Sequence, residues 1–423
     1  MKSMMITIPV EPGITLRAIR TDRFKTGCFS INLLQPHRRE TASVDALLPS
    51  VLLHGTARYP DITAVTNRLD DLYGATLGTL VRRKGETRFV GFYADFIEDA
   101  FVPDGEAVFA PMLELAAQTL YEPYLENGCF CARYVESEKQ NLINAIEASL
   151  NDKRSYAVTQ MLQTMCAGEA YGVPRLGYAE DVAAITPEAL FARYQALLQA
   201  APIEVFYAGR QEPEHVAALL RTLLRRPAAP LPLPETQVVR TVDRPKERIE
   251  ALDVTQGKLS IGLRTGITVQ DADYPALLLL NAVFGACYTS KLFLHVREER
   301  SLCYYASSSL EKYKGLMVVN SGVDFAQFET ARDAILAELD ACRRGEISDY
   351  ELESARKQCL SSLRSSMDTP SHLDDFYIGS AVAKIDDLPV LMDKLKALTA
   401  AELAAAARKL QLDTVYFLKG VQA

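Results

Sequence analysis

Histidines and cysteines carry the widest chemistry in this chain, and their spacing limits what they can do. The five histidines are His37, His54, His215, His295 and His372. No two lie one helical turn apart, so no helix can present a pair of imidazoles to one zinc ion. Of the eight cysteines, only Cys129 and Cys131 lie close in sequence. Because no second pair completes a tetrahedral set, we interpret these two as small, buried, reduced thiols. A zinc site built from scattered ligands remains an alternative.

Other catalytic and binding motifs are missing from the sequence. There is no Gly-x-Ser-x-Gly elbow and no dinucleotide-binding glycine fingerprint. Gly172 and Gly177 have the spacing of a phosphate-binding loop, but Tyr178 stands where lysine is required. The net charge of −8, without a basic block, argues against nucleic-acid binding. With neither a long apolar run nor an export signal, we expect no membrane contact and a cytoplasmic location.

The elements that would position a site occur twice. Thr186 and Thr399 each precede a predicted apolar-periodic helix, because threonine is a favoured N-cap residue. Each helix leads into a β-branched and aromatic strand that ends in glycine, at 203–209 and at 414–420. The copies lie half the chain length apart, which indicates an internal duplication.

Two predicted hairpins repeat in the same way. The first pairs strands at 76–81 and 89–95, and the second pairs strands at 304–311 and 316–324. Between the copies, the run at 226–234 contains too many prolines for a helix or a central strand. We interpret it as an extended linker, with an irregular loop inside one domain as the alternative.

This order of elements predicts an α+β fold. Strands joined by short turns are antiparallel, and the helices grouped between them can cover one face of a sheet. We expect two homologous halves, each a mostly antiparallel sheet with helices packed on one face. The predicted boundaries are an N-terminal half at 1–225, a proline-rich linker at 226–246 and a C-terminal half at 247–423.

The duplicated halves, the linker and the segment 292–304 together resemble the insulinase/pitrilysin-type (M16) zinc metallopeptidases. Segment 292–304 is a Val-Arg-Glu-rich helix that runs into Leu-x-Tyr, and the likeness extends from about Ile14 to Gly420. This family includes mitochondrial processing peptidase. The resemblance implies that the two halves form a clam shell around a chamber.

The zinc motif of that family is replaced here. Active members carry an inverted His-x-x-Glu-His motif, followed a few residues later by Gly-Thr. Gly55-Thr56 is present, but the motif positions hold Ala46, Pro49 and Ser50. Alanine cannot coordinate zinc, serine is a poor substitute for imidazole, and proline removes the general base that would activate water. The resemblance therefore implies no catalytic residue, no bound metal and no cofactor.

The third zinc ligand of the family is also replaced. It is a glutamate near the end of a helix that corresponds here to the helix containing Glu138. The ligand position falls on Ala145, with Glu147 two residues away. We interpret Glu147 as a surface carboxylate and His54 as a solvent-facing or capping residue before Gly55. A metallopeptidase with unorthodox zinc ligands remains an alternative.

One functional element of the family is matched in the second half. There the family uses an arginine and a tyrosine, seven residues apart, to hydrogen-bond the substrate backbone near the zinc. Arg297 and Tyr304 have this spacing, so the resemblance implies that they bind substrate. A guanidinium fork and a phenol both suit a carbonyl or a developing oxyanion. The alternative is an ion pair for Arg297 and a half-buried strand position for Tyr304.

Two further segments point to one subgroup of this family. Leu69–Ala75 and Tyr304–Ser308 are similar to a non-catalytic bacterial subgroup linked with aminopentanol modification of elongation factor P. That subgroup is normally encoded beside a relative with the zinc motif, which implies a heterodimer with a His-x-x-Glu-His-bearing partner. We predict a non-catalytic pseudopeptidase subunit that binds or clamps a peptide or unfolded segment and completes the partner's chamber. A structural scaffold protein is the alternative.

Overall fold

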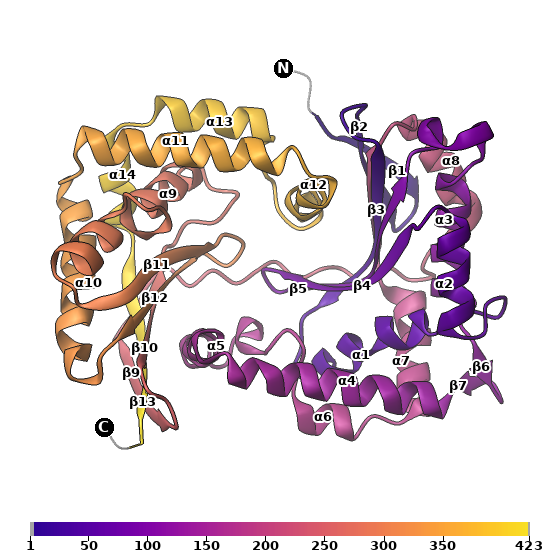
Figure 1. The fold of residues 1–423 in the computed structure, drawn as a ribbon, viewed down its shortest axis with the longest axis horizontal. Helices are drawn as coiled ribbons and strands as arrows, with labels where there is room; N and C mark the ends of the chain where they lie inside the picture. Colours follow the sequence, from indigo (N-terminus) through magenta and orange to yellow (C-terminus); the bar gives the residue numbers. More distant parts are fainter. Residues whose placement is uncertain (1–3, 422–423) are drawn as a thin grey trace. The chain divides into compact units, whose positions relative to one another are not determined.

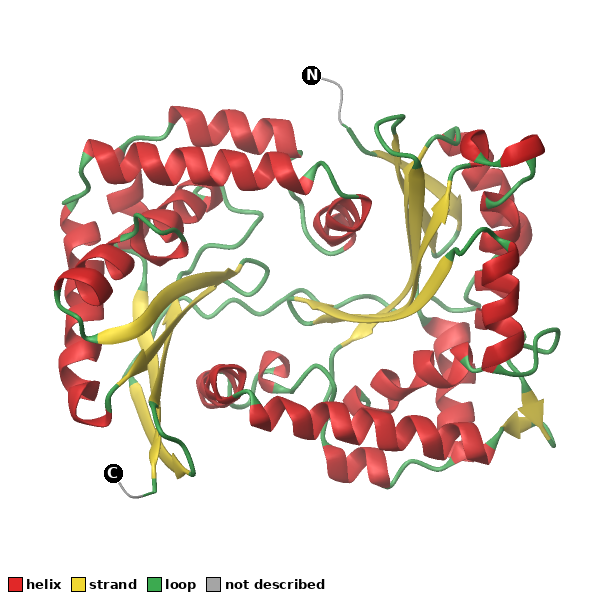
Figure 2. Cartoon of the chain, in the orientation of Figure 1, coloured by secondary structure: helices red, strands yellow, loops and turns green. Residues whose placement is uncertain are grey.

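A computed structural model describes residues 4–421, which divide into two compact units (Figures 1 and 2). Unit 1 comprises the chain up to Glu147, Val173–Glu235 and Met367–Val382. Unit 2 comprises Ala148–Gly172, Thr236–Ser366 and the chain from Ala383 onward. Each unit contains an α+β arrangement around its own sheet, as predicted. No helix within 4–421 combines the length and the apolar character that a membrane span requires.

Unit 1 is built on a six-stranded sheet in the order β1-β2-β8-β3-β5-β4. Neighbouring strands are antiparallel except β2 and β8, which run parallel. The strands are β1 (Ile6–Glu11), β2 (Ile14–Arg20), β3 (Thr26–Pro36), β4 (Thr76–Lys84), β5 (Thr87–Ile97) and β8 (Ile203–Gly209). A separate small hairpin consists of β6 (Leu125–Glu126) and β7 (Cys129–Phe130).

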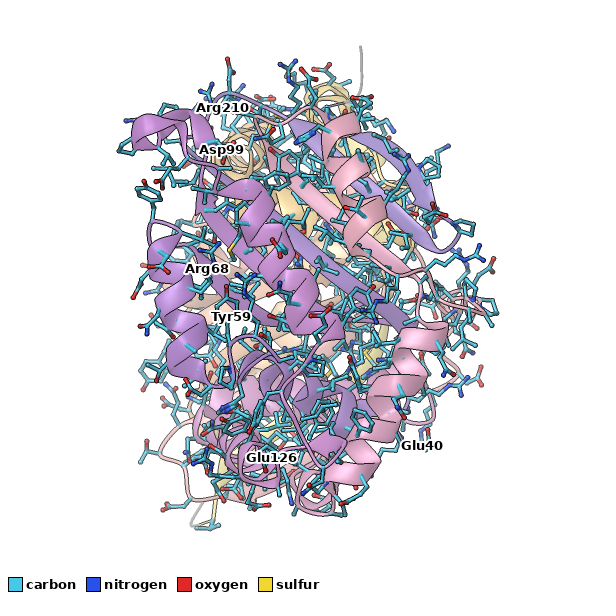
Figure 3. The ribbon with its side chains drawn as sticks, turned by 90° about the vertical axis from the view of Figure 1, so that its right-hand side faces the viewer. Glu40, Tyr59, Arg68, Asp99, Glu126 and Arg210 are labelled. Atoms are coloured by element: carbon cyan, nitrogen blue, oxygen red, sulfur yellow. The ribbon has the colours of Figure 1, made fainter. Side chains whose placement is uncertain are left out.

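The helices of unit 1 pack mainly on one face of this sheet. They are α1 (Ala42–Leu53), α2 (Ile62–Asp71), α3 (Phe109–Tyr121), α4 (Ala132–Asn151), α6 (Ala179–Ala183), α7 (Pro187–Ala200), α8 (Pro213–Leu223) and α12 (Pro370–Tyr377). Short 3-10 turns lie at η1 (Asp99–Phe101), η2 (Pro103–Gly105) and η7 (Ile378–Ala381). Asp99 fixes the start of α3, because its carboxylate accepts from the backbone N–H of Phe109 at 3.0 Å (Figure 3).

Unit 2 is built on a five-stranded sheet in the order β11-β12-β10-β13-β9, in which only the β13–β9 pair is parallel. The strands are β9 (Lys246–Leu252), β10 (Gly257–Arg264), β11 (Cys303–Glu311), β12 (Leu316–Val323) and β13 (Gln411–Gly420). The α-helices are α5 (Lys153–Met165), α9 (Tyr274–Asn281), α10 (Phe328–Arg344), α11 (Asp349–Ser366), α13 (Leu388–Ala397) and α14 (Ala400–Ala407). The shorter turns are η3 (Ala170–Gly172), η6 (Phe325–Gln327) and two π-helices, η4 (Ala282–Ala286) and η5 (Leu292–Glu299).

The repeated helix starts and hairpins of the sequence are confirmed. Thr186 caps α7 by accepting from the N–H of Ala189 at 3.2 Å. Thr399 caps α14 and forms a reciprocal capping box with Glu402. The predicted hairpins are β4–β5 and β11–β12, both antiparallel.

The second face of each sheet also carries a helix, and this differs from the expected single helical layer. In unit 1, α12 packs on β3 and β8, opposite α3 and α8 (Figure 1). Side chains alternate along β3, so Phe29 and Ile31 enter the apolar core while Ser30 faces α12. Ser30 donates to Asp374 at 2.7 Å, and Arg82 pairs with the same carboxylate. These polar partners hold α12 on the sheet.

Unit 2 likewise contains a helix from the other half of the sequence. Helix α5, from the first half of the sequence, packs on β10 and β13 opposite α10 and α14 (Figure 1). Met161 and Met165 join Tyr416 in an apolar cluster. A Cβ added at Gly262 would lie 2.5 Å from the Met161 sulfur, so glycine allows this close approach.

Because each unit takes a helix from the other sequence half, the compact units differ from the predicted ranges 1–225 and 247–423. The linker predicted at 226–246 is divided between them after Glu235. Those boundaries describe the two copies in the sequence, and as domain limits they remain a prediction.

Candidate functional site

The zinc-motif positions lie on helix α1, which packs into the core of unit 1. Ala46 is only 5% exposed, Pro49 is buried, and Ser50 is half-buried. The neighbouring Leu47 and Leu48 belong to the main apolar cluster. The positions that the resemblance predicts for two imidazoles and a carboxylate therefore carry small or apolar side chains, of which Ala46 and Pro49 are buried in the packing of unit 1.

The position of the third ligand lies on helix α4. Glu138, Leu142 and Ala145 follow one another at spacings of four and three residues, so they share one helix face. Leu142 packs partly against the apolar core, which fixes the rotation of this helix. Ala145 and Glu147 are both exposed, as expected for a surface carboxylate at position 147.

His54 has a different environment from the one expected. It ends α1, where its N–H bonds to the carbonyl of Val51, so the capping interpretation is confirmed. Its ring is not solvent-facing, because Nε2 lies 2.8 Å from the Glu138 carboxylate and the ring stacks on Tyr134 at 4.6 Å between centroids. Asn141 also donates to Glu138 at 3.0 Å. Sequence reasoning missed this cluster, because a contact across this separation has no local pattern.

This arrangement does not fit a zinc ion. Across residues 4–421, no three His, Cys, Asp or Glu side chains gather in a way that could hold a metal. A catalytic zinc requires three protein ligands and one open position. His54 and Glu138 supply two donors, and they bond to each other. Cys131 is buried as predicted, while Cys129 is half-buried in the β6–β7 hairpin.

The two predicted substrate-binding residues lie in unit 2, Arg297 in η5 and Tyr304 near the start of β11. The Arg297 guanidinium lies over the Phe293 ring, 4.7 Å from its centroid, and its Nε is 3.4 Å from Glu298. Tyr304 is 59% exposed and donates to Asp324 at 3.1 Å. That hydrogen bond raises the pKa of Tyr304 and keeps its phenol protonated. The ion pair that the alternative expects for Arg297 is thus present, with Glu298, whereas the half-buried position that it expects for Tyr304 is wrong, because this side chain is exposed.

Both residues occupy irregular backbone. Arg297 lies in a π-helix, a form that is rare and frequent at functional sites. Cys303 and Tyr305 pair with consecutive residues of β12, so Tyr304 is the extra residue of a β-bulge. Bulges re-aim a side chain away from the regular alternation of a strand. Ser301, with φ of 51°, adds a left-handed turn between the two residues.

An exposed aromatic residue adjoins this segment and was not singled out from the sequence. Tyr288 is 80% exposed and meets the edge of the Phe293 ring, with centroids 5.8 Å apart. Phe293 therefore contacts both Tyr288, edge to face, and the Arg297 guanidinium that lies over its ring. We call Tyr288, Phe293, Arg297 and Tyr304 the η5–β11 surface.

The chain is similar to known proteins along its whole length. Residues 184–359 match the family model described as the peptidase M16 inactive domain. A relative from Bacillus subtilis, named probable inactive metalloprotease YmfF, is 32% identical over 97% of this chain and 96% of its own. A solved structure of a conserved protein from Enterococcus faecalis has a TM-score of 0.91 at 26% identity and covers 100% of both chains.

A second solved structure supports the fold alone. It is a peptidase M16 inactive domain from Pseudomonas fluorescens, with a TM-score of 0.81 at 16% identity over 99% of this chain and 98% of that one. The Bacillus subtilis relative, at 32% identity over 97% of this chain, confirms the family resemblance inferred from the sequence. With this identity and coverage, the chain belongs to the M16 peptidase family, as an inactive peptidase homologue.

Proposed function

We propose that this chain is a cytoplasmic pseudopeptidase subunit that binds an extended peptide and completes the chamber of a zinc-bearing family partner. One contrast carries the proposal: the predicted zinc-motif positions have small or apolar side chains, while Arg297 and Tyr304 on the η5–β11 surface offer polar donors. Irregular backbone such as a π-helix or a β-bulge is frequent at functional sites. Its presence at both Arg297 and Tyr304 therefore favours a role in binding substrate. Arg297 offers several N–H donors and Tyr304 one O–H, which suits peptide carbonyls.

The position of Tyr304 favours a peptide over a folded ligand. Strand β11 is the edge of its sheet, so its outer backbone groups have no strand partner there. An extended peptide can add to such an edge through main-chain hydrogen bonds, with side chains giving specificity. Aromatic surface for the side chains of the peptide comes from Tyr304, near the start of this edge strand, and from Tyr288, which contacts Phe293.

The first experiment identifies the partner. The tagged chain is recovered gently from its own cells, and co-purifying proteins are identified by mass spectrometry. The proposal predicts a His-x-x-Glu-His relative of similar length in equal amount. Recovery of the chain alone, or as a homodimer, contradicts the heterodimer.

The second experiment tests the surface in the reconstituted pair. Arg297→Ala with Tyr304→Phe should lower peptide turnover by about tenfold or more, because charge-assisted hydrogen bonds to the substrate are lost. Arg300→Ala with Tyr350→Phe is the matched control, since both residues are exposed in the same unit. Unchanged turnover in the first variant would overturn the assignment of these residues.

The two other candidate functions predict different outcomes. A scaffold would bind the partner without altering peptide turnover at all. A metallopeptidase with unorthodox ligands would hydrolyse peptide without a partner and lose this activity to a chelator. The association with elongation factor P modification remains a prediction from the resemblance, and deletion of the gene followed by mass spectrometry of that factor checks it.

A further inference from the structure

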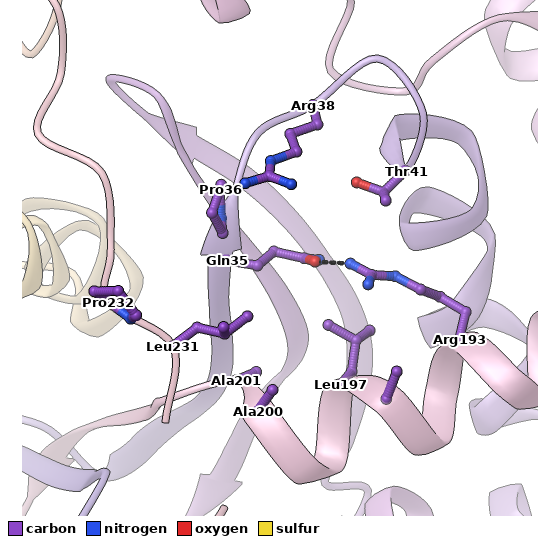
Figure 4. A pocket seen from close by; sticks show the side chains of 11 residues that line it. Gln35, Pro36, Arg38, Thr41, Arg193, Leu197, Ala200, Ala201, Leu231 and Pro232 are labelled. Atoms are coloured by element: carbon purple, nitrogen blue, oxygen red, sulfur yellow. Dashed lines mark hydrogen bonds between the residues drawn. The ribbon is translucent and has the colours of Figure 1, made fainter. Parts of the chain in front are cut away.

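Unit 1 contains a cavity at the opposite end of α1 from Gly55. Its volume is about 240 Å³, and it lies between the end of β3, the start of α1, the end of α7 and the linker. Gln35, Arg38 and Thr41 line it on one side, and Leu197, Ala200 and Leu231 line it on the other (Figure 4). The cavity is therefore lined mainly by apolar side chains with a few polar groups, as small-molecule sites are.

On the polar side, the nitrogen of one buried amide makes no hydrogen bond. Gln35 is only 2% exposed, and its Oε1 accepts a hydrogen bond from Arg193 (Figure 4). This bond fixes the orientation of the carboxamide, because a guanidinium can only donate. The Gln35 Nε2 is then a buried donor with no acceptor among the described residues. A buried donor without an acceptor is costly, so a ligand oxygen placed there is favoured.

Thr41 adds a second unused group. It is the N-cap residue of α1, yet its side chain makes no capping hydrogen bond. Its buried Oγ1 has no partner within residues 4–421. The start of a twelve-residue helix carries partial positive charge from its free N–H groups, which favours an anion.

The guanidinium groups at the cavity have different roles. Arg193 is held by the Asp45 carboxylate at 2.7 Å and by Gln35, so its charge is compensated inside the protein. Arg38 is exposed, and within the described chain its guanidinium has neither an ion pair nor a side-chain hydrogen bond. Arg38 can therefore turn toward an anion in the cavity, and Figure 4 shows it on the same side as Thr41.

We propose that this cavity binds a carboxylate that carries a short aliphatic side chain. The carboxylate would accept from Gln35 Nε2, Thr41 Oγ1 and Arg38, and the aliphatic group would lie against Leu197, Ala200 and Leu231. A phosphate would leave the apolar wall unused, and a cation would meet the positive charges of Arg38 and Arg193. The same chemistry occurs in a free small carboxylate and at the C-terminus of a peptide ending in leucine.

Isothermal titration calorimetry of the full chain tests this with N-acetyl-L-leucine. We expect a dissociation constant of about 1 mM or tighter, and about tenfold weaker binding of N-acetyl-L-leucinamide, which lacks the charge. Absence of binding, or equal binding of the amide, overturns the proposal. A pentapeptide of four alanines and a C-terminal leucine separates the two sources. Tighter binding of this peptide supports a peptide C-terminus, and equal binding supports a free carboxylate.

Variants place the binding in the cavity. Gln35→Glu keeps an acceptor for Arg193 but replaces the buried donor with a negative charge, so affinity should fall by about tenfold or more. Arg38→Ala changes an exposed residue and should weaken binding several-fold without affecting the fold. Arg58→Ala, which removes an exposed cation elsewhere in unit 1, is the matched control. Equal affinity of the Arg38 and Arg58 variants contradicts the site, as does unchanged affinity of a folded Gln35 variant.

Discussion

Two regions of this molecule differ in how their side chains are packed. In unit 1 the zinc-motif helix α1 has become a core element, with Ala46 at 5% exposure and Pro49 buried. In unit 2 the η5–β11 surface is irregular in backbone and exposed in side chain, with Tyr304 at 59% exposure. Side chains of α1 contribute to the stability of unit 1, whereas Tyr304 is accessible to a binding partner.

This difference indicates how each region should respond to substitution. A packed region tolerates few changes of volume, whereas an exposed region tolerates many changes without loss of stability. Function is therefore expected to depend on the η5–β11 surface, and folding on α1. Substitutions at the two regions should separate these two properties, and the following predictions are ordered by the size of the expected effect.

Restoring the ligands tests whether α1 and α4 still have the geometry of a zinc site. The substitutions Ala46→His, Pro49→Glu, Ser50→His and Ala145→Glu supply the three ligands and the general base of the family. We expect zinc affinity to rise by about a thousandfold or more, because three protein ligands then converge on one position. Competition with a chromophoric chelator measures it. The variant that keeps Ala145 is the control, and equal affinity of the two shows that the helices no longer converge.

Enlarging a packed position tests the conversion of α1 into core. Ala46→Leu should lower the free energy of unfolding by about 1–3 kcal/mol, because added methyl groups overpack the space beside Leu47. Urea denaturation of the full chain measures this change. A fully stable variant would mean that position 46 still borders open space, as a ligand position would.

Removing the His54 ring tests the cluster that now lies beside the old motif. His54→Ala breaks the hydrogen bond to Glu138 and the stack on Tyr134. We expect a loss of about 1 kcal/mol in the free energy of unfolding, typical of one partly buried hydrogen bond. His54→Gln, which can still donate to Glu138, should recover part of it. If the two variants are equally stable, the stack rather than the hydrogen bond carries the effect.

The smallest effect on stability is expected at the η5–β11 surface. Tyr304→Phe removes only an exposed hydroxyl that donates to Asp324, so the urea midpoint should not change. Arg297→Ala should have an effect almost as small, since the Arg297 side chain is 39% exposed and its neighbour Glu298 is exposed too. A clear drop in the midpoint would show that these residues are structural and would remove the contrast with α1.

Local patterns predicted much of the fold. Thr186 and Thr399 were placed correctly at helix starts, because an N-cap and the helix that follows it form a local pattern. The hairpins were also found, since a turn between two alternating strands lies within about twenty residues. Both features depend on neighbours in the sequence.

The exchanged helices and the polar contacts were not predictable in this way. Helix α12 is held by Ser30 and Arg82, whose positions in the chain are far from Asp374. Amphipathic pattern shows that a helix must be buried but not on which sheet. The same reason hides the His54–Glu138 bond. The bulge at Tyr304 was missed because it lies at the start of β11, where only Cys303 precedes the extra residue and too little alternation exists to be broken.

The zinc content of the natural chain tests the central claim most directly. The purified chain is equilibrated with excess zinc, dialysed, and analysed for metal by mass spectrometry. We predict far less than one zinc per chain, because Ala46, Ser50 and Ala145 supply no ligand and His54 is bonded to Glu138. One zinc per chain, retained on dialysis and lost in a His54→Ala, Glu138→Gln variant, would contradict this account and identify a metal site of a new kind.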